Sequence, residues 1–291
     1  MLGADLPPFR CKLPTGSTAL KAAEVDGFEG RGVHTIPVFR ITAVSVGLML
    51  LLWRPCCGWQ PSDAVTASLQ QIRTDYGVTV HYHYQRERFF PAAWLRQPVN
   101  GRGGQIDLDE LPRLVKLLDG FFRRYPDSVL KRNLKAIYLV SDLEFFGKSY
   151  GATQSRTAVY LCIGNAAKTW TDSFLTARLH SEFSSILMQN HDFPAAKWKA
   201  LNPENFKYSG SGVEVLGTKS LYGQSELLLR RGFLVRYSQS SLENDFNMLS
   251  DWLFTRPEKL AELCNDHPQL AAKRTLAIQF YLSIDKRFKL K

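Results

Sequence analysis

The stretch Leu179–Leu187, with the sequence LHSEFSSIL, decides the fold. It lies in a longer segment, Asp172–Asn190, that we predict to be a helix because Thr171 or Asp172 can cap it. Apolar residues recur in this segment at helical spacing and form one stripe: Leu175, Leu179, Phe183, Ile186 and Leu187. One side of the helix is therefore expected to be buried.

The polar residues of this stretch have the spacing of a metal-binding helix. A zincin places two histidines four residues apart on one helical face to bind zinc, and a glutamate beside the first histidine acts as general base. Glu182-Phe183 stands where such a helix has Glu-Phe, but Ser181 and Ser185 occupy both histidine positions. Taken alone this match is weak, since many amphipathic helices could carry it.

Downstream residues strengthen the match. The helix is followed by Gly232–Tyr237 (GFLVRY), then by Ser241–Phe246 (SLENDF), then by Pro257–Leu260 and a closing helix. In order and spacing the chain resembles a family of bacterial zinc-binding metallopeptidases of the zincin type, related to the anthrax lethal-factor-like enzymes. In that family HEFxH precedes a GF…Y segment, an acidic E-D-F-A-E helix and a closing helix. The resemblance covers roughly Leu69 to Phe288 and implies a zincin-like domain.

The resemblance also assigns roles to single positions. Glu182 matches the catalytic base, and Tyr237 matches a tyrosine that assists near the metal. Asn244, seven residues after Tyr237, stands where the third zinc ligand is a glutamate, and Met248 replaces a second glutamate. Ser181, Ser185 and Asn244 lack the basic nitrogen or anionic oxygen that zinc prefers. We therefore expect no zinc cofactor, and an inactive pseudopeptidase whose residual cleft binds a peptide or a protein.

Two other functions stay open. The first is an active zinc metallopeptidase with a rearranged site built from His180, Glu182, His191 and Asp245, with Glu243 as a further candidate. His180 points about 100° around the helix from Ser181, so its use requires the helix to rotate. The ordinary interpretation places both histidines on the helix surface and both acidic residues in the first turn of a helix. The second is a cell-surface structural protein with a filled cleft.

The order of elements predicts an α+β fold, with a small mixed sheet and the central helix followed by a helical carboxyl half. Residues 192–223 are expected to form a long loop. Predicted strands cover Val78–Tyr84, Leu134–Val140 and Thr157–Ile163, with a hairpin around Gly147–Gly151; predicted helices cover Asp109 to about Arg123, Leu242–Thr255, Pro257–Cys264 and Pro268–Ile284.

Residues 1–60 are expected to be a leader region that resembles a signal peptide, and residues 61–291 to form the zincin-like domain. Ile41–Trp53 is uncharged and apolar, follows Arg40 and has the length of a signal-peptide core rather than of a membrane span. We predict an exported protein with a signal peptide around residues 40–58, and translation starting near Val33. A lipid anchor at Cys56 or an uncleaved membrane tether is the rival interpretation.

Composition excludes other classes. The net charge of +10 is diffuse, with no basic stripe on a nucleic-acid-binding module, so we expect no nucleic-acid partner. Gly147–Gly151 matches the G-x-S-x-G elbow of serine hydrolases around Ser149, but no helix is expected directly after it. His81 and His83 are taken as polar-face residues of a strand. Cys162 and Cys264 are either paired or buried free thiols.

Overall fold

The computed structural model describes residues 61–165, 168–210 and 222–290, which all belong to one compact unit. The predicted signal peptide, its start near Val33 and the rival anchor at Cys56 lie outside the described residues. In the part of the chain that is described, no helix has the length and apolar character needed to cross a membrane.

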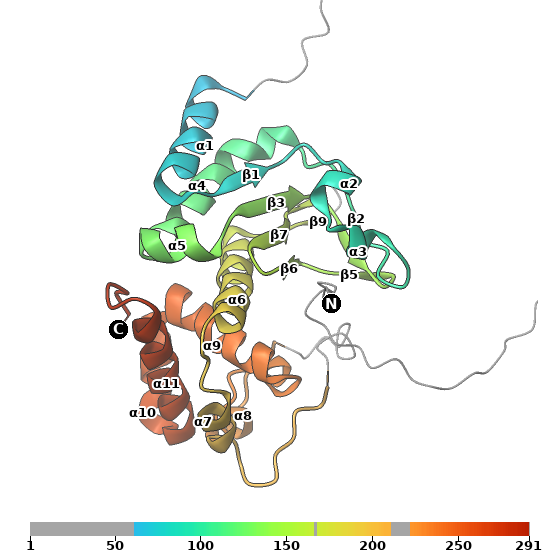
Figure 1. Cartoon of the computed structure of the whole chain (residues 1–291). Coiled ribbons are helices and arrows are strands. Elements are labelled where there is room, and N and C mark those ends of the chain that lie inside the picture. The colour runs from blue at the N-terminus through green and yellow to red at the C-terminus, as the bar shows by residue number, and fades with distance from the viewer. Residues whose placement is uncertain (1–60, 166–167, 211–221, 291) are drawn as a thin grey trace, which may run out of the picture. The chain divides into compact units, whose positions relative to one another are not determined.

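A small mixed sheet forms the centre of the amino half (Figure 1). Its strand order is β1 (Thr79–His81), β3 (Ala136–Val140), β7 (Ala158–Cys162) and β6 (Ala152–Gln154). The first three strands are parallel, and β6 runs antiparallel to β7 at the edge of the sheet. The predicted mixed sheet is confirmed. The strand expected over Val78–Tyr84 is too long, because only three residues pair with β3.

The two faces of this sheet pack against different layers. On one face, Tyr138 stacks on Tyr160 with ring centroids 4.7 Å apart, and Phe90 and Trp94 cover them. Trp94 belongs to α3 (Ala92–Leu95), and Phe90 lies in the connection between α3 and the preceding helix α2 (Arg86–Phe89). Because side chains alternate along a strand, the fully buried residues Ile137, Leu139, Val159 and Leu161 point to the other face, where α6 contacts β6 and β7.

Two further small sheets and three helices complete the amino half. The sheets pair β2 (Arg102–Gly103), β4 (Leu143–Phe145) and β5 (Lys148–Ser149), and β8 (Gly164–Asn165) with β9 (Lys168–Thr169). The helices are α1 (Asp63–Tyr76), α4 (Leu111–Phe122) and α5 (Asp127–Asn133). A 3-10 turn (Leu108–Glu110) precedes α4, and Asp107 caps that turn by accepting from the Asp109 amide, so the α-helix begins two residues after the predicted start at Asp109.

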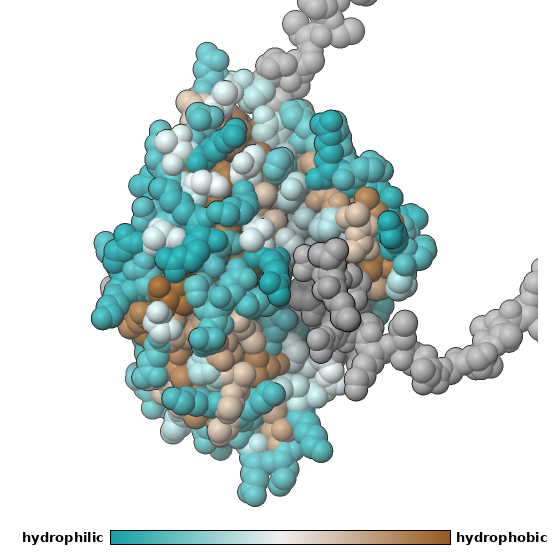
Figure 2. All heavy atoms as spheres, viewed as in Figure 1, coloured by the Kyte–Doolittle hydropathy of each residue, from teal (hydrophilic) through white to brown (hydrophobic). Residues whose placement is uncertain are grey.

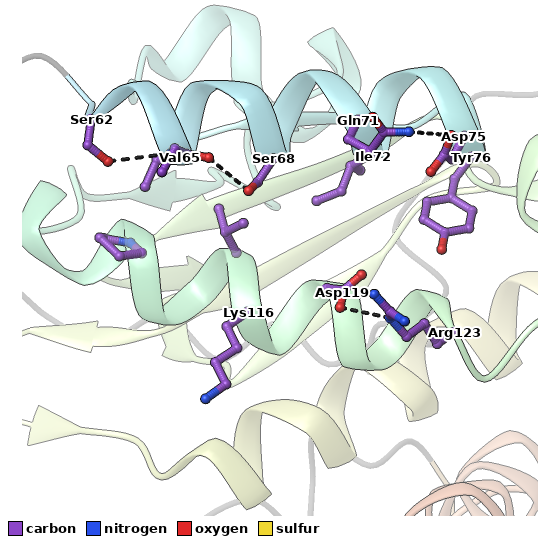
Figure 3. A pocket seen from close by; sticks show the side chains of 13 residues that line it. Ser62, Val65, Ser68, Gln71, Ile72, Asp75, Tyr76, Lys116, Asp119 and Arg123 are labelled. Carbon is purple, nitrogen blue, oxygen red and sulfur yellow. Dashed lines mark hydrogen bonds and ion pairs between the residues drawn. The ribbon is translucent and has the colours of Figure 1, made fainter.

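A groove of about 500 Å³ separates α1 from α4 (Figure 3). Two pairs of its polar side chains each lie within a single helix: Gln71 Nε2 donates to Asp75 Oδ1 at 2.7 Å, and Arg123 pairs with Asp119 at 2.8 Å. The residues predicted to carry function lie elsewhere, on the central helix and beyond it.

The central helix α6 (Asp172–Asn190) has the predicted bounds. Thr171 caps it, since its hydroxyl accepts from the Phe174 amide at 3.2 Å. One side of α6 contacts the sheet and another packs along α9 (Leu242–Thr255), so α6 joins the two halves of the unit (Figure 1). Ser241 caps α9 by accepting from the Asn244 amide at 3.0 Å.

The carboxyl half is helical, as predicted. It contains α7 (Ala195–Ala200), α8 (Glu226–Arg230), α9, α10 (Pro257–Asp266) and α11 (Pro268–Ile284). The long loop expected over 192–223 is wrong where it includes α7, which carries the fully buried Trp198. Figure 2 shows hydrophilic side chains over much of the visible surface.

Candidate functional site

A small cavity of about 90 Å³ lies where α6 faces α9. Its lining brings together the positions that the sequence singled out: Ser181, Glu182, Ser185, Tyr237, Asn244 and Met248. Glu243 of the fallback set lines the same cavity. Ser149, Gly151 and Ala152, at and before the edge strand β6, form another wall.

Helical spacing explains why these side chains meet. On α6, Ser181 and Ser185 are four residues apart and therefore share one face. Glu243 and Asn247 are related in the same way on α9. Because α6 and α9 pack along one another, the two polar faces border one space.

Some of these side chains are fixed by hydrogen bonds, whereas others have polar atoms without a hydrogen-bond partner among the described residues. Asn247 Nδ2 donates to Ser185 Oγ at 2.7 Å, which links the two helices. Asn244 Nδ2 donates to Ser240 Oγ at 2.8 Å, which anchors it to the turn after Tyr237. Within the described residues, Ser181 Oγ is buried without a hydrogen-bond partner.

The two carboxyl groups of the cavity are electrostatically unfavourable neighbours. Burial raises the pKa of Glu182 to about 7, the Arg178 guanidinium opposes this rise, and the Glu243 carboxylate adds to it. Burial also raises the pKa of Glu243, and Ser185 and Gln154 partly offset that rise. Glu243 stands in the first turn of α9, where the helix dipole favours negative charge. Glu182 is therefore the carboxyl that holds a proton more readily.

Aromatic rings form the remaining wall. The rings of Tyr222 and Tyr237 lie 5.6 Å apart, and the Arg178 guanidinium lies 5.6 Å from the Phe174 ring centre and 6.0 Å from that of Tyr222. Burial raises the pKa of the Tyr237 hydroxyl, so Tyr237 stays a neutral hydrogen-bonding group at physiological pH.

The histidines and Asp245 of the rearranged-site hypothesis do not line this cavity. His180 is buried rather than on the helix surface, so that interpretation is wrong. Its Nδ1 lies 2.8 Å from Tyr125 Oη, and its ring stacks on Phe254. Burial lowers the pKa of His180 to about 3. His191 Nε2 lies 3.1 Å from Asn133 Oδ1.

Asp245 belongs to a separate buried cluster. Its Oδ2 accepts from Lys273 Nζ at 2.7 Å, and from Trp198 Nε1 and the Tyr208 hydroxyl at 2.8 Å each. Burial raises the pKa of the Asp245 carboxyl, and the Lys273 ammonium counteracts this. Asp245 is thus committed to holding α9 against α7 and α11.

The donor set of the cavity does not fit zinc. The lining offers the hydroxyl and amide groups of Ser181, Ser185 and Asn244, whereas zinc prefers imidazole nitrogen, thiolate or carboxylate. Over the described ranges, no group of three or more histidine, cysteine, aspartate or glutamate side chains is placed to hold a metal ion.

The other sequence features are structural. After Ser149 the chain enters strand β6, so no helix follows the serine as a nucleophile elbow requires. Cys162 and Cys264 are not joined in a disulfide. His81 stacks on Tyr138 with ring centroids 4.6 Å apart.

Sequence reasoning missed three contributors to the cavity: Arg178, Asn247 and Tyr222. Two of them could have been found from the sequence. Arg178 is one turn before Glu182 and Asn247 is one turn after Glu243, so each shares a helical face with a candidate site residue. Tyr222 lies in the segment expected to be a loop, where spacing gives no indication of what a side chain contacts.

In sequence, no protein-family model and no curated protein matches this chain. In structure, the chain is similar to a protein of Bacteroides caccae that is described as a "putative zinc-binding metallo-peptidase". The two share 14% identity with a TM-score of 0.51, over 79% of this chain and 89% of that one. The chain therefore has a metallopeptidase-like fold.

Proposed function

We propose that this chain is an exported, catalytically inactive relative of zincin-type metallopeptidases that binds an extended peptide or protein segment. The observation that carries the proposal is the lining of one cavity by Ser181, Ser185 and Asn244 beside Glu182. These are the positions that the resemblance assigns to two histidines, a glutamate ligand and the general base.

The chemistry of such a site depends on the metal. Bound zinc lowers the pKa of its water ligand to about 7 and so supplies the nucleophile. Hydroxyl and amide groups provide no comparable Lewis acid. Glu182, whose own pKa is raised to about 7, then has no activated water from which to take a proton. Peptide hydrolysis by this route is not expected.

The edge of the sheet supports a binding role. No described strand pairs with the outer side of β6, and Ala152 at its start lines the cavity. Ala152, Thr153 and Gln154 are 8%, 1% and 0% exposed, so a peptide can pair with β6 only after the groups that cover this edge have moved aside. An extended peptide added there by main-chain hydrogen bonds would pass beside Glu182. Peptide binding along this edge needs no metal.

Restoring the ligands tests the proposal. We expect S181H/S185H/N244E to retain about one equivalent of zinc after dialysis against metal-free buffer, because imidazole and carboxylate then meet at one point. The wild-type chain is expected to retain none. Elemental analysis gives the stoichiometry, and the zinc-dependent rise in melting temperature reports binding to the folded state.

The matched control is S181N/S185N/N244Q, which enlarges the same three side chains without adding zinc ligands. Stoichiometric zinc and peptide hydrolysis in the wild-type chain would contradict the proposal and favour the rearranged active site. A restored variant that folds but binds no more zinc than the control would show that the three positions are not a lapsed zinc site.

Export is part of the proposal and has its own test. The segment concerned, residues 40–58, precedes the described unit. We expect the mature native protein to begin after this segment, and amino-terminal sequencing of that protein decides it. A mature form that retains residues 1–30 would contradict the predicted signal peptide.

A further inference from the structure

We propose that the cavity between α6 and α9 binds a primary ammonium group carried by a peptide, either a lysine side chain or an amino terminus. This inference rests on the proposed peptide-binding function and names the chemistry that the cavity selects. Four groups around the cavity carry it: Ser181, Glu182, Glu243 and Asn247.

Unpaired polar atoms point to a hydrogen-bonding guest. Ser181 is 2% exposed and Asn247 7% exposed, and both line the cavity. In the described part of the chain, Ser181 Oγ and Asn247 Oδ1 are buried without a hydrogen-bond partner. A buried polar group without a partner costs about 1–3 kcal/mol. Because Asn247 Nδ2 already donates to Ser185, the open atom of Asn247 is an acceptor, so a guest that reaches this atom must donate.

The charge of the cavity also calls for a cation. Neither Glu182 nor Glu243 has an ion-pair partner within 4.0 Å among the described residues, whereas buried Asp245 has Lys273 at 2.7 Å. Arg178 is the positive group of the lining and favours the charged form of Glu182. Its guanidinium lies over the rings of Phe174 and Tyr222, and among the described residues its Nε is buried without a hydrogen-bond partner. A cation between Glu182 and Glu243 would offset the burial that disfavours the charged form of each carboxyl, and the smaller repulsion that Glu243 exerts on Glu182.

The shape and the walls favour an ammonium over a bare metal ion. An ammonium has three donors, which match two carboxylates and the Asn247 carbonyl. Its methylene stem would lie against Tyr222 and Tyr237, as amphipathic side chains do on apolar surfaces. Calcium takes six to eight oxygen ligands, and the aromatic wall supplies few. The volume of about 90 Å³ admits a small group rather than a bulky side chain.

Matched small probes test the inference on the full chain. We would titrate Nα-acetyl-lysine N-methylamide, its Nε-acetylated form, and alanine N-methylamide with a free amino terminus, following tyrosine fluorescence and amide chemical shifts. We expect the lysine probe to bind at least about tenfold more tightly than its Nε-acetylated form, a difference of about 1.4 kcal/mol. Comparison with the alanine probe distinguishes a side-chain ammonium from an amino terminus.

Two variants localise the effect. E182Q/E243Q keeps the size of both side chains and is expected to lose the preference for the charged probe. E258Q is the matched control, because Glu258 is an exposed carboxylate in the first turn of α10, just as Glu243 is in the first turn of α9. E258Q is expected to bind the probes like the wild type.

Three results would overturn the inference. They are equal binding of charged and acetylated lysine probes, no binding of either ammonium probe at millimolar concentration, and occupation of the cavity by Ca²⁺, Mg²⁺ or Mn²⁺ that excludes them. Each leaves the zinc-restoration result unaffected, so failure of this inference is distinguishable from failure of the proposed function.

Discussion

At the scale of single residues, Glu182 shows how a buried carboxyl group can lower the stability of a fold. Its folded pKa of about 7 lies above the ordinary carboxyl value of 4.5, because the group is buried beside Glu243. Between these two values the folded state binds more protons than the unfolded chain. Stability therefore falls as pH rises through this window, since ionisation of Glu182 is harder in the folded state.

We expect E182Q to remove this loss of stability at high pH. Relative to wild type, E182Q should gain about 2 kcal/mol more in free energy of unfolding at about pH 8 than at about pH 5, after allowance for partial solvent screening. Urea unfolding at both pH values measures the difference. His180, whose pKa is lowered, has the opposite pH dependence in both proteins and largely cancels in the comparison.

The control for this prediction is E258Q, which removes an exposed carboxylate. It should change stability by no more than about 0.5 kcal/mol at either pH. An E182Q protein whose stability follows that of wild type at both pH values would contradict the raised pKa of Glu182.

At the scale of secondary-structure elements, α11 is held to α9 by a buried ion pair. Lys273 Nζ lies 2.7 Å from Asp245 Oδ2, and the two side chains are 0% and 3% exposed. Lys273 also lies 4.0 Å from the centre of the Phe233 ring. Removing one partner of such a pair leaves a buried charge without compensation, which costs more than the pair itself contributes.

We therefore expect K273M to destabilise the protein by about 3–5 kcal/mol and D245N/K273M to recover part of this loss. Chemical unfolding measures both. K259M is the control, because Lys259 forms an exposed pair with Glu262 and should cost about 0–1 kcal/mol. A K273M variant as stable as K259M would show that Asp245 is protonated in the folded state.

Elements with strong local signals could be predicted from the sequence. The bounds of α6, α9 and α11 follow from capping residues and proline, as Thr171, Ser241 and Pro268 show. Short elements could not be predicted. The helices α2 and α3 have four residues each, too few for an apolar period, and α7 interrupts a segment rich in loop-forming residues. Strand β1 ends where pairing with β3 ends, which is a tertiary constraint.

At the scale of the whole unit, the site depends on contacts between distant segments. Ser181, Glu182, Ser185 and Asn244 could be singled out as candidate site residues from the sequence. The motif that contains them depends on the spacing of residues within one helix or one short segment, which the sequence shows directly. The surroundings of His180 could not be predicted, since the residues that bury it, Tyr125 and Phe254, come from other parts of the chain. Which acidic side chain faces the cavity, Glu243 or Asp245, depends on the rotation of α9 against α6 and is likewise a property of packing.

Phe254 lies at the junction of the two halves. It is 3% exposed and contacts Tyr125 and His180 on the sheet side, with ring centroids 4.7 and 4.9 Å away. On the helical side it contacts Tyr281 of α11 at 5.2 Å. Because one buried ring joins α6, α9 and α11, the sheet and the carboxyl-terminal helices are expected to unfold as one cooperative unit.

We predict that F254A lowers the free energy of unfolding by about 3–5 kcal/mol and that the loss is shared by both halves. Native-state hydrogen exchange measures it, since the slowest amides of β3 and of α11 should lose protection equally. The control is L227A, at a side chain that is 67% exposed, which should leave both unchanged. Faster exchange in α11 with unchanged exchange in β3 would mean that the helical half opens independently, and a cavity shared by α6 and α9 would then be only transiently complete.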